Sequence, residues 1–134
     1  MSSHADATFE INAWQEATYD VPEEGSKLLR ATVHKTFQGD VKGTSTAELL
    51  MVRAGDEGGE GYVATERITG TVGDRAGSFV VQHGGVSSRQ MHQFGYIVKD
   101  SGTGDLHGIV GTCRYQHDET GARFSLDYEF KAAS

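Results

Sequence analysis

The sequence contains one cysteine and one proline, and it has no long apolar run. A lone Cys113 excludes an internal disulfide and a zinc site built from cysteines alone, and it fits a reducing cytoplasm. No apolar stretch approaches the roughly 20 residues of a membrane-spanning helix. The N-terminus also lacks the charged-then-apolar layout of a signal peptide. We therefore expect a soluble, cytoplasmic protein that does not enter a membrane.

Basic residues are also scarce, with 12 Lys and Arg against 19 Asp and Glu and a net charge of -7. The basic residues are scattered, so the sequence predicts neither nucleic-acid binding nor a polybasic membrane patch. Six histidines are present, but none falls in the H-x-H or H-E-x-x-H spacing of a metal site. We expect no metal and no cofactor.

Glycine, by contrast, is abundant, with 18 residues in a chain of 134. Together with evenly spread Thr, Val and aromatic residues, it indicates many strands joined by tight turns. We expect a disordered N-terminus over residues 1–6 and a single domain over residues 7–134. The expected strands cover residues 8–18, 27–37, 43–53, 62–72, 75–85, 91–98, 106–116 and 123–130.

Eight consecutive, hairpin-connected strands favour an all-β, antiparallel, up-and-down β-barrel, because closure removes the exposed sheet edges. The interior of such a barrel is either filled by side chains or wide enough for one small ligand. A sandwich of two sheets is the alternative.

The stretch 62–85 is the clearest hairpin of the chain. A Gly-Asp turn at residues 73–74 suits the positive φ angles of a two-residue loop. This turn places Glu66 opposite Val81 and diagonal to His83 on a mostly apolar face. We expect burial without a nearby cation to raise the pKa of the Glu66 carboxyl group.

Two further hairpins extend this interior face. A turn at Gly39 and Asp40 places Glu48 opposite Ala31 on the interior, where it could pair with Glu66. A four-residue loop over residues 118–121 places the last two strands, and continuing the same face across residues 100–105 adds the sixth strand. The residues expected to line a substrate-binding interior are Tyr62, Glu48, Phe79, Val81, His92, Phe94, Tyr96, Tyr115, Leu126 and Tyr128.

Three stretches in order, ERITGTV (residues 66–72), GSFVVQHGG (77–85) and SGTGDLHG (101–108), resemble a family of small bacterial proteins of unknown function. The fold of that family is similar to allene oxide cyclase-like and lipocalin-like barrels. Relatives of this barrel type include cyclases of natural-product pathways that fold a reactive intermediate in an apolar cavity. The resemblance thus implies a barrel, and by analogy a cyclase.

Glu66 and His83 are the candidate catalytic residues, as a general acid and base on an otherwise apolar face. The alternative is that both belong to a hydrogen-bonded core network with no chemical role. Three functions fit these residues: a cofactor-independent isomerase or cyclase, a non-catalytic carrier or sensor of a small hydrophobic molecule, and a filled barrel that acts by self-assembly. Trp14, Val63 and Val80 lie on outward faces, so we expect a homodimer or higher homo-oligomer.

Overall fold

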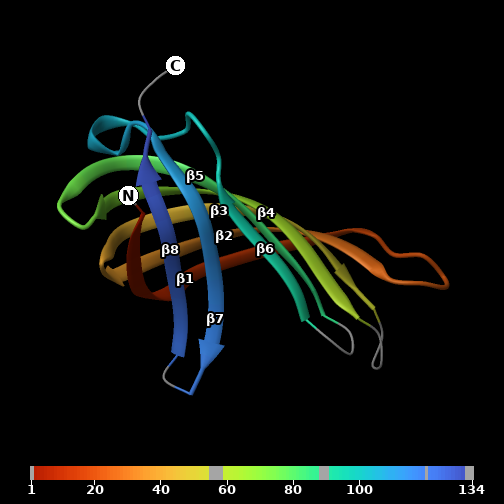
Figure 1. The fold of residues 1–134 in the computed structure, drawn as a ribbon. Helices are drawn as coiled ribbons and strands as arrows, with labels where there is room; N and C mark the ends of the chain where they lie inside the picture. The colour runs from red at the N-terminus through yellow and green to blue at the C-terminus, as the bar shows by residue number, and fades with distance from the viewer. Residues whose placement is uncertain (1, 55–58, 88–90, 120, 132–134) are drawn as a thin grey trace.

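The computed structural model describes residues 2–54, 59–87, 91–119 and 121–131. Its elements are β1 (Ser3–Asp20), β2 (Lys27–Gly39), β3 (Val41–Arg53), β4 (Glu60–Val72), β5 (Arg75–Ser87), β6 (Met91–Ile97), the 3-10 helix η1 (Gly104–Leu106), β7 (Ile109–Asp118) and β8 (Gly121–Phe130). Each strand pairs antiparallel with the next, and β1 also pairs with β8. The sheet therefore closes into a barrel (Figure 1), which confirms the all-β antiparallel fold and excludes the sandwich.

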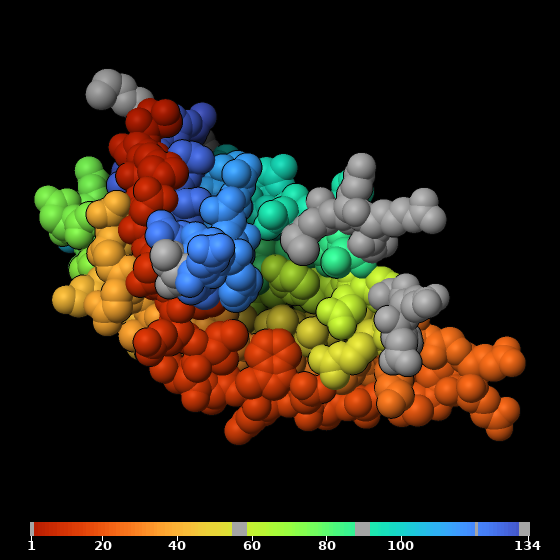
Figure 2. Space-filling model, turned by 90° about the horizontal axis from the view of Figure 1, so that it is seen from below, coloured from red at the N-terminus to blue at the C-terminus, as the bar shows by residue number. Residues whose placement is uncertain are grey.

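The barrel is irregular in the lengths of its strands. Strands β1 to β5 are long and curved, whereas β6 has seven residues and pairs with β7 at only two positions, Tyr96 with Thr112 and Ile97 with Gly111. Figure 1 shows β6 and β7 diverging beyond this seam. The connection between β1 and β2 projects past the body of the barrel in both views (Figure 1 and Figure 2). No helix among the described residues is long and apolar enough to cross a membrane.

β1 begins at Ser3, although the sequence predicts disorder for residues 1–6. The physical reason is barrel closure, since Ser3 pairs with Tyr128 and Phe9 with Ala122 across the β1–β8 junction. This pairing orders the backbone and buries Ala5, Ala7 and Phe9, and it has no signal in the local sequence. Met1 lies outside the described residues.

The registers of two predicted hairpins are confirmed. In the β4–β5 hairpin Glu66 faces Val81, and Gly73 takes a φ of 61° in the tight turn. In the β7–β8 hairpin Cys113 faces Leu126. Both turns are short and symmetric, so the local sequence fixes which residues face each other.

The predicted register of the β2–β3 hairpin is wrong by one residue. Glu48 pairs with Thr32 rather than with Ala31. The backbone of Asp40 at the turn bonds to β1 and to the β4–β5 turn instead. Its N–H donates to the Asp6 carbonyl (2.9 Å), and its carbonyl accepts from Gly73 N–H (2.8 Å). These tertiary hydrogen bonds replace the expected two-residue turn, and the slip exchanges the two faces of β3.

The connection between β6 and β7 is not a hairpin, which reverses the predicted faces of β6. It crosses the end of the barrel, where Thr103 N–H donates to the Ser78 carbonyl (2.8 Å) and Leu106 is fully buried. The register of β6 is set by β5 instead, with Val81 facing Ile97. Gly95 and Ile97 therefore point inward, and Phe94 and Tyr96 point outward.

The interior contains two apolar clusters with a polar layer beside them. The larger cluster fills the end covered by η1, and its largest fully buried side chains are Phe37, Phe79, Phe124, Ile68, Leu106, Ile109 and Leu126. The smaller cluster is formed by Ala31, Val33, Ala47, Leu49 and Ala64, with Met51 and Tyr62 packed against it. Three of its five members are alanines, so these side chains occupy less of the interior.

Candidate functional site

Glu66 lies in the interior of the barrel with no exposed surface, as the central hairpin predicts. It sits on β4 between Ala47 of β3 and Val81 of β5. A carboxyl group at such a position is stable only if its oxygens are hydrogen-bonded. The structure provides donors from four other strands.

Each carboxylate oxygen of Glu66 is bonded. Oε1 accepts hydrogen bonds from Lys35 Nζ (3.1 Å), His83 Nε2 (2.8 Å) and the Tyr115 hydroxyl (2.7 Å). Oε2 accepts a hydrogen bond from the Ser45 hydroxyl (2.6 Å). Lys35 is itself buried, with 7% of its surface exposed, so the Lys35–Glu66 pair is an ion pair inside the barrel.

The carboxyl group of Glu66 is an anion, contrary to the expectation of a raised pKa. Burial raises the pKa, but hydrogen bonds from His83 and Ser45 and the positive charge of Lys35 together lower it to about 2. The prediction fails because it placed no cation on this face. Glu66 is therefore a fixed negative charge at neutral pH. Any proton transfer at this site must use the neighbouring side chains.

His83 connects Glu66 to a hydroxyl group. Its Nε2 lies 2.8 Å from Glu66 Oε1, and its Nδ1 lies 2.9 Å from the Tyr62 hydroxyl. A carboxylate accepts but cannot donate, so the hydrogen-bond network assigns the imidazole proton to Nε2. In the neutral imidazole, Nδ1 then accepts a hydrogen bond from the Tyr62 hydroxyl group. The result is a hydroxyl–imidazole–carboxylate chain.

The two tyrosines of this site hold their protons firmly. Burial and the nearby Glu66 charge raise the pKa of Tyr62 to about 12. Burial and the same charge raise the pKa of Tyr115 well above its usual range. At neutral pH both side chains are therefore neutral phenols that can donate a hydrogen bond.

A cavity of about 190 Å³ opens beside the hydrogen-bonded side chains of Tyr62 and His83. Its polar lining includes Tyr62, His83 and Lys35, and the rest of its wall is mostly apolar. Trp14, which is 41% exposed, lies at its outer edge together with the exposed Ile11. The interior is thus packed at the η1 end and hollow beside the polar layer, with access from solvent. The residues that line this cavity are Phe9, Ile11, Trp14, Val33, Lys35, Leu49, Met51, Tyr62, His83, Tyr115 and His117.

Most of the aromatic and aliphatic residues predicted for the interior lie there. Tyr62 and Tyr115 border the cavity. Phe79, Val81 and Leu126 belong to the packed cluster at the η1 end, and Tyr128 packs against that cluster. These last four residues therefore support the barrel and do not border the cavity.

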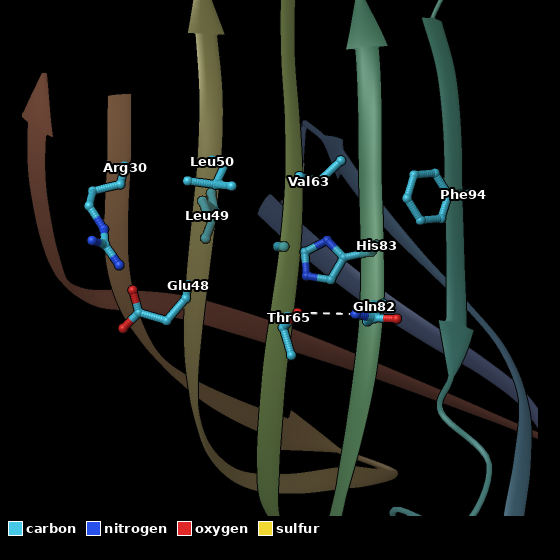
Figure 3. Close-up of a pocket in the computed structure, with 10 residues that line it drawn as sticks. Arg30, Glu48, Leu49, Leu50, Val63, Thr65, Gln82, His83 and Phe94 are labelled. Carbon is cyan, nitrogen blue, oxygen red and sulfur yellow. Dashed lines mark hydrogen bonds between the residues drawn. The ribbon is translucent and has the colours of Figure 1, made fainter. Parts of the chain in front are cut away.

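Four residues predicted for the interior lie on the outer face. Glu48 is exposed and accepts a hydrogen bond from the Thr32 hydroxyl (2.9 Å), and Figure 3 shows it on the outside with Arg30. His92, Phe94 and Tyr96 are also exposed. The one-residue slip of β3 accounts for Glu48, and the register that β5 imposes on β6 accounts for the other three.

Lys35 and Ser45 are the site residues that the sequence prediction missed. Ser45 becomes an interior position only in the observed β2–β3 register, where it faces Lys35. Lys35 shares the interior face of β2 with Val33 in either register. A signal for Lys35 exists in the sequence, since it takes the place of an apolar residue in the alternation Val33, Lys35, Phe37. Such a charged residue within a buried alternation indicates a partner of opposite charge.

The described residues contain no group of three His, Cys, Asp or Glu side chains placed to hold a metal ion. His92 and His107 do not join Glu66 and His83, because both are exposed on the surface. Cys113 is buried in the larger apolar cluster, and burial raises the pKa of its thiol to about 12.

Comparison with known proteins identifies relatives of the chain. The sequence model of a family described as "Protein of unknown function (DUF3224)" matches residues 5–130. The fold is similar to the crystal structure of a protein of unknown function from this family in Shewanella oneidensis MR-1, with 27% sequence identity and a TM-score of 0.89. That similarity covers 98% of this chain and 100% of the other. No curated protein matches the chain.

Proposed function

This chain belongs to the DUF3224 family of proteins of unknown function, and we propose that it is a cofactor-independent isomerase or cyclase acting on a small hydrophobic molecule. The observation that carries the proposal is the hydrogen-bonded chain from Tyr62 through His83 to Glu66 at the wall of an apolar cavity. A hydroxyl, an imidazole and a carboxylate in this order form the arrangement that moves a proton in many hydrolases.

Proton transfer follows from the direction of these hydrogen bonds. A proton leaves a carbon atom of the substrate for the Tyr62 oxygen as the Tyr62 proton passes to His83 Nδ1. Because the pKa of Tyr62 is about 12, the two transfers are coupled and no free phenolate accumulates. Return of the proton to another carbon completes an isomerisation with no change in oxidation state.

Glu66 acts as a positioning residue in this scheme. Its carboxylate holds the Nε2 proton of His83 and stabilises the imidazolium that forms when Nδ1 takes up the Tyr62 proton. Lys35, Ser45 and Tyr115 keep Glu66 ionised and fixed. A cyclisation that begins with loss of a proton uses the same groups.

The cavity limits the size of the substrate. A cavity of about 150 Å³ holds benzene, and this cavity measures about 190 Å³. By this scale a molecule of about eight non-hydrogen atoms fits, whereas a long polyene does not fit without extending past Trp14 into solvent.

A non-catalytic carrier or sensor is the second candidate. It is favoured by the completeness of the polar network, since no buried side-chain nitrogen or oxygen among the described residues lacks a hydrogen-bond partner. A network with all its bonds made is also what a purely structural polar layer requires. Turnover separates the two candidates.

We further infer a homodimer or higher assembly of a cytoplasmic protein. Leu50 (52% exposed), Val63 (52%) and Phe94 (47%) lie on one outer face, across β3, β4 and β6 (Figure 3). They line a groove of about 480 Å³ together with Arg30 and Glu48. A face with apolar groups and both charges is self-complementary, as a twofold contact requires.

The test of the enzyme proposal uses a panel of small apolar molecules in D₂O. Wild-type protein, His83→Gln and His34→Gln are each incubated with the panel, and gas chromatography with mass spectrometry detects isomers and incorporated deuterium. His34 is exposed on β2, so its variant is the matched control. We expect conversion in the wild type and in His34→Gln and a loss of about 10²–10⁴-fold in His83→Gln. Equal conversion in His83→Gln contradicts the proton relay, and binding without conversion supports the carrier.

A further inference from the structure

We propose that Lys35 binds the oxygen atom of the substrate and that the substrate is a small, neutral, enolisable carbonyl compound. This inference rests on the proposed proton relay and names the chemical class on which it acts. The observation behind it is the surroundings of the Lys35 ammonium group at the cavity wall.

The Lys35 ammonium group has hydrogen-bonding capacity that the protein does not use. An ammonium group carries three N–H donors. Its one hydrogen bond among the described residues goes to Glu66 Oε1. On its other sides Nζ lies 4.9 Å from the centre of the Phe9 ring and 4.5 Å from that of Tyr115. Aromatic faces attract a cation but leave its N–H groups available to an oxygen acceptor in the cavity.

The charges at the site favour a neutral ligand over an anion. The Lys35 cation is already balanced by Glu66, which is ionised and has no exposed surface. An anionic ligand would bring a second negative charge close to this buried carboxylate, and like charges disfavour each other at such a site. A carbonyl oxygen accepts the free N–H groups without adding a charge.

The carbonyl group also explains why a lysine would accompany the Tyr62–His83 relay. Removing a proton from the carbon next to a carbonyl moves negative charge onto the carbonyl oxygen. A cation already in place at that oxygen stabilises the developing enolate more than the ketone. The proton moves to Tyr62 while the Tyr62 proton moves to His83, and its return to the same or another carbon restores a neutral carbonyl compound.

Two probes of the same shape test the role of Lys35. Acetophenone and α-methylstyrene differ only in the replacement of the carbonyl oxygen by a CH₂ group. The ratio of their dissociation constants is measured by titration for wild type, Lys35→Met and the control Lys42→Met, whose lysine is exposed on β3. A hydrogen bond from a charged donor predicts that Lys35→Met weakens acetophenone relative to α-methylstyrene by about 10- to 100-fold. Lys42→Met keeps the wild-type ratio.

A second variant guards against misfolding of Lys35→Met, which leaves Glu66 charged and unpaired. The double variant Lys35→Met/Glu66→Gln removes both charges, and the same loss of acetophenone preference is expected there. An unchanged ratio in these variants, or a wild-type protein that binds neither probe, overturns the proposal.

The failure of this inference is distinguishable from failure of the proton relay. Deuterium uptake into the methyl group of acetophenone reports the relay, and the binding ratio reports Lys35. If uptake depends on Tyr62 but the binding ratio is the same with and without Lys35, the relay stands and the assignment of Lys35 to the substrate oxygen is wrong. If the binding ratio depends on Lys35 but deuterium uptake is the same with and without the Tyr62 hydroxyl, the oxygen site stands and the enzyme proposal fails.

Discussion

Lys35 and Glu66, 31 residues apart in the sequence, form a 3.1 Å ion pair inside the barrel. The pair joins β2 to β4 across the intervening strand β3, and His83 adds a bond to the same oxygen from β5. Taking two charges out of water is costly, and the cost is recovered only if both remain paired. The stability of the barrel and the ionisation of its polar layer therefore depend on this contact.

Removing only one member of the pair is expected to destabilise the protein strongly. Lys35→Met leaves a buried carboxylate without its cation, so we expect a loss of about 3–5 kcal/mol in the free energy of unfolding. The double variant Lys35→Met/Glu66→Gln leaves no charge unpaired and is expected to recover much of that loss. Urea unfolding measures both. A Lys35→Met protein as stable as the wild type would show that the pair does not form.

The same contact makes the stability of the protein depend on pH. The pKa of Glu66 is lowered from 4.5 to about 2 in the folded state. The stability contributed by the carboxylate is therefore fully present above about pH 4.5 and is lost as the pH falls toward 2. The shift corresponds to about 3 kcal/mol.

The measurement for this prediction compares the wild type with Glu66→Gln, because other carboxyl groups titrate equally in both. We expect the difference in unfolding free energy between the two proteins to shrink as the pH is lowered from 5 to 2. Parallel stability curves over that range would mean that Glu66 has an ordinary pKa in the folded protein.

Packing at the η1 end is tested by Leu126→Ala. Leu126 is fully buried in the larger apolar cluster, so its truncation should cost about 2–5 kcal/mol. Val21→Ala is the control, because Val21 is 65% exposed in the β1–β2 connection, and it should change stability by less than about 0.5 kcal/mol. Thermal or chemical unfolding of both variants gives the values. A loss below about 0.5 kcal/mol for Leu126→Ala would contradict a packed interior at this end.

The apolar groove on the outer face predicts that the protein forms a dimer or a higher assembly. A monomer has a mass of 14.4 kDa, and we expect light scattering to give at least a dimer. Val63→Asp places a charge in the middle of the apolar groove and should shift the protein toward the monomer. A wild-type protein that stays at the monomer mass at high concentration would rule out the assembly.

The parts of the fold that the sequence predicts correctly are those with short local turns. The Gly73–Asp74 turn sets the β4–β5 register, and that register alone places Glu66 and His83 together in the interior. The β7–β8 hairpin places Leu126 for the same reason. In both cases the residues that determine the pairing are adjacent in the chain.

The parts that the sequence predicts wrongly are set by contacts between distant segments. The β2–β3 turn is shifted by the backbone hydrogen bonds that Asp40 makes with Asp6 and Gly73, and the shift moves Glu48 outward and brings Ser45 inward. The prediction also places no cation beside Glu66, and this omission reversed the expected direction of the shift in the Glu66 pKa. Neither of these long-range hydrogen bonds has a local pattern, so Glu66 and His83 could be located from the sequence but their contacts with Lys35 and Ser45 could not.

Removing the Tyr62 hydroxyl is the most direct test of the proton relay. Tyr62→Phe deletes the atom that faces His83 Nδ1 and keeps the ring, and Tyr128→Phe makes the same change at the other end of the interior. The rate of deuterium uptake from D₂O into the methyl group of acetophenone is measured by NMR for both variants and the wild type. We predict a rate about 10²–10⁴-fold lower for Tyr62→Phe and an unchanged rate for Tyr128→Phe. Equal rates in all three proteins would contradict proton transfer through Tyr62 and His83.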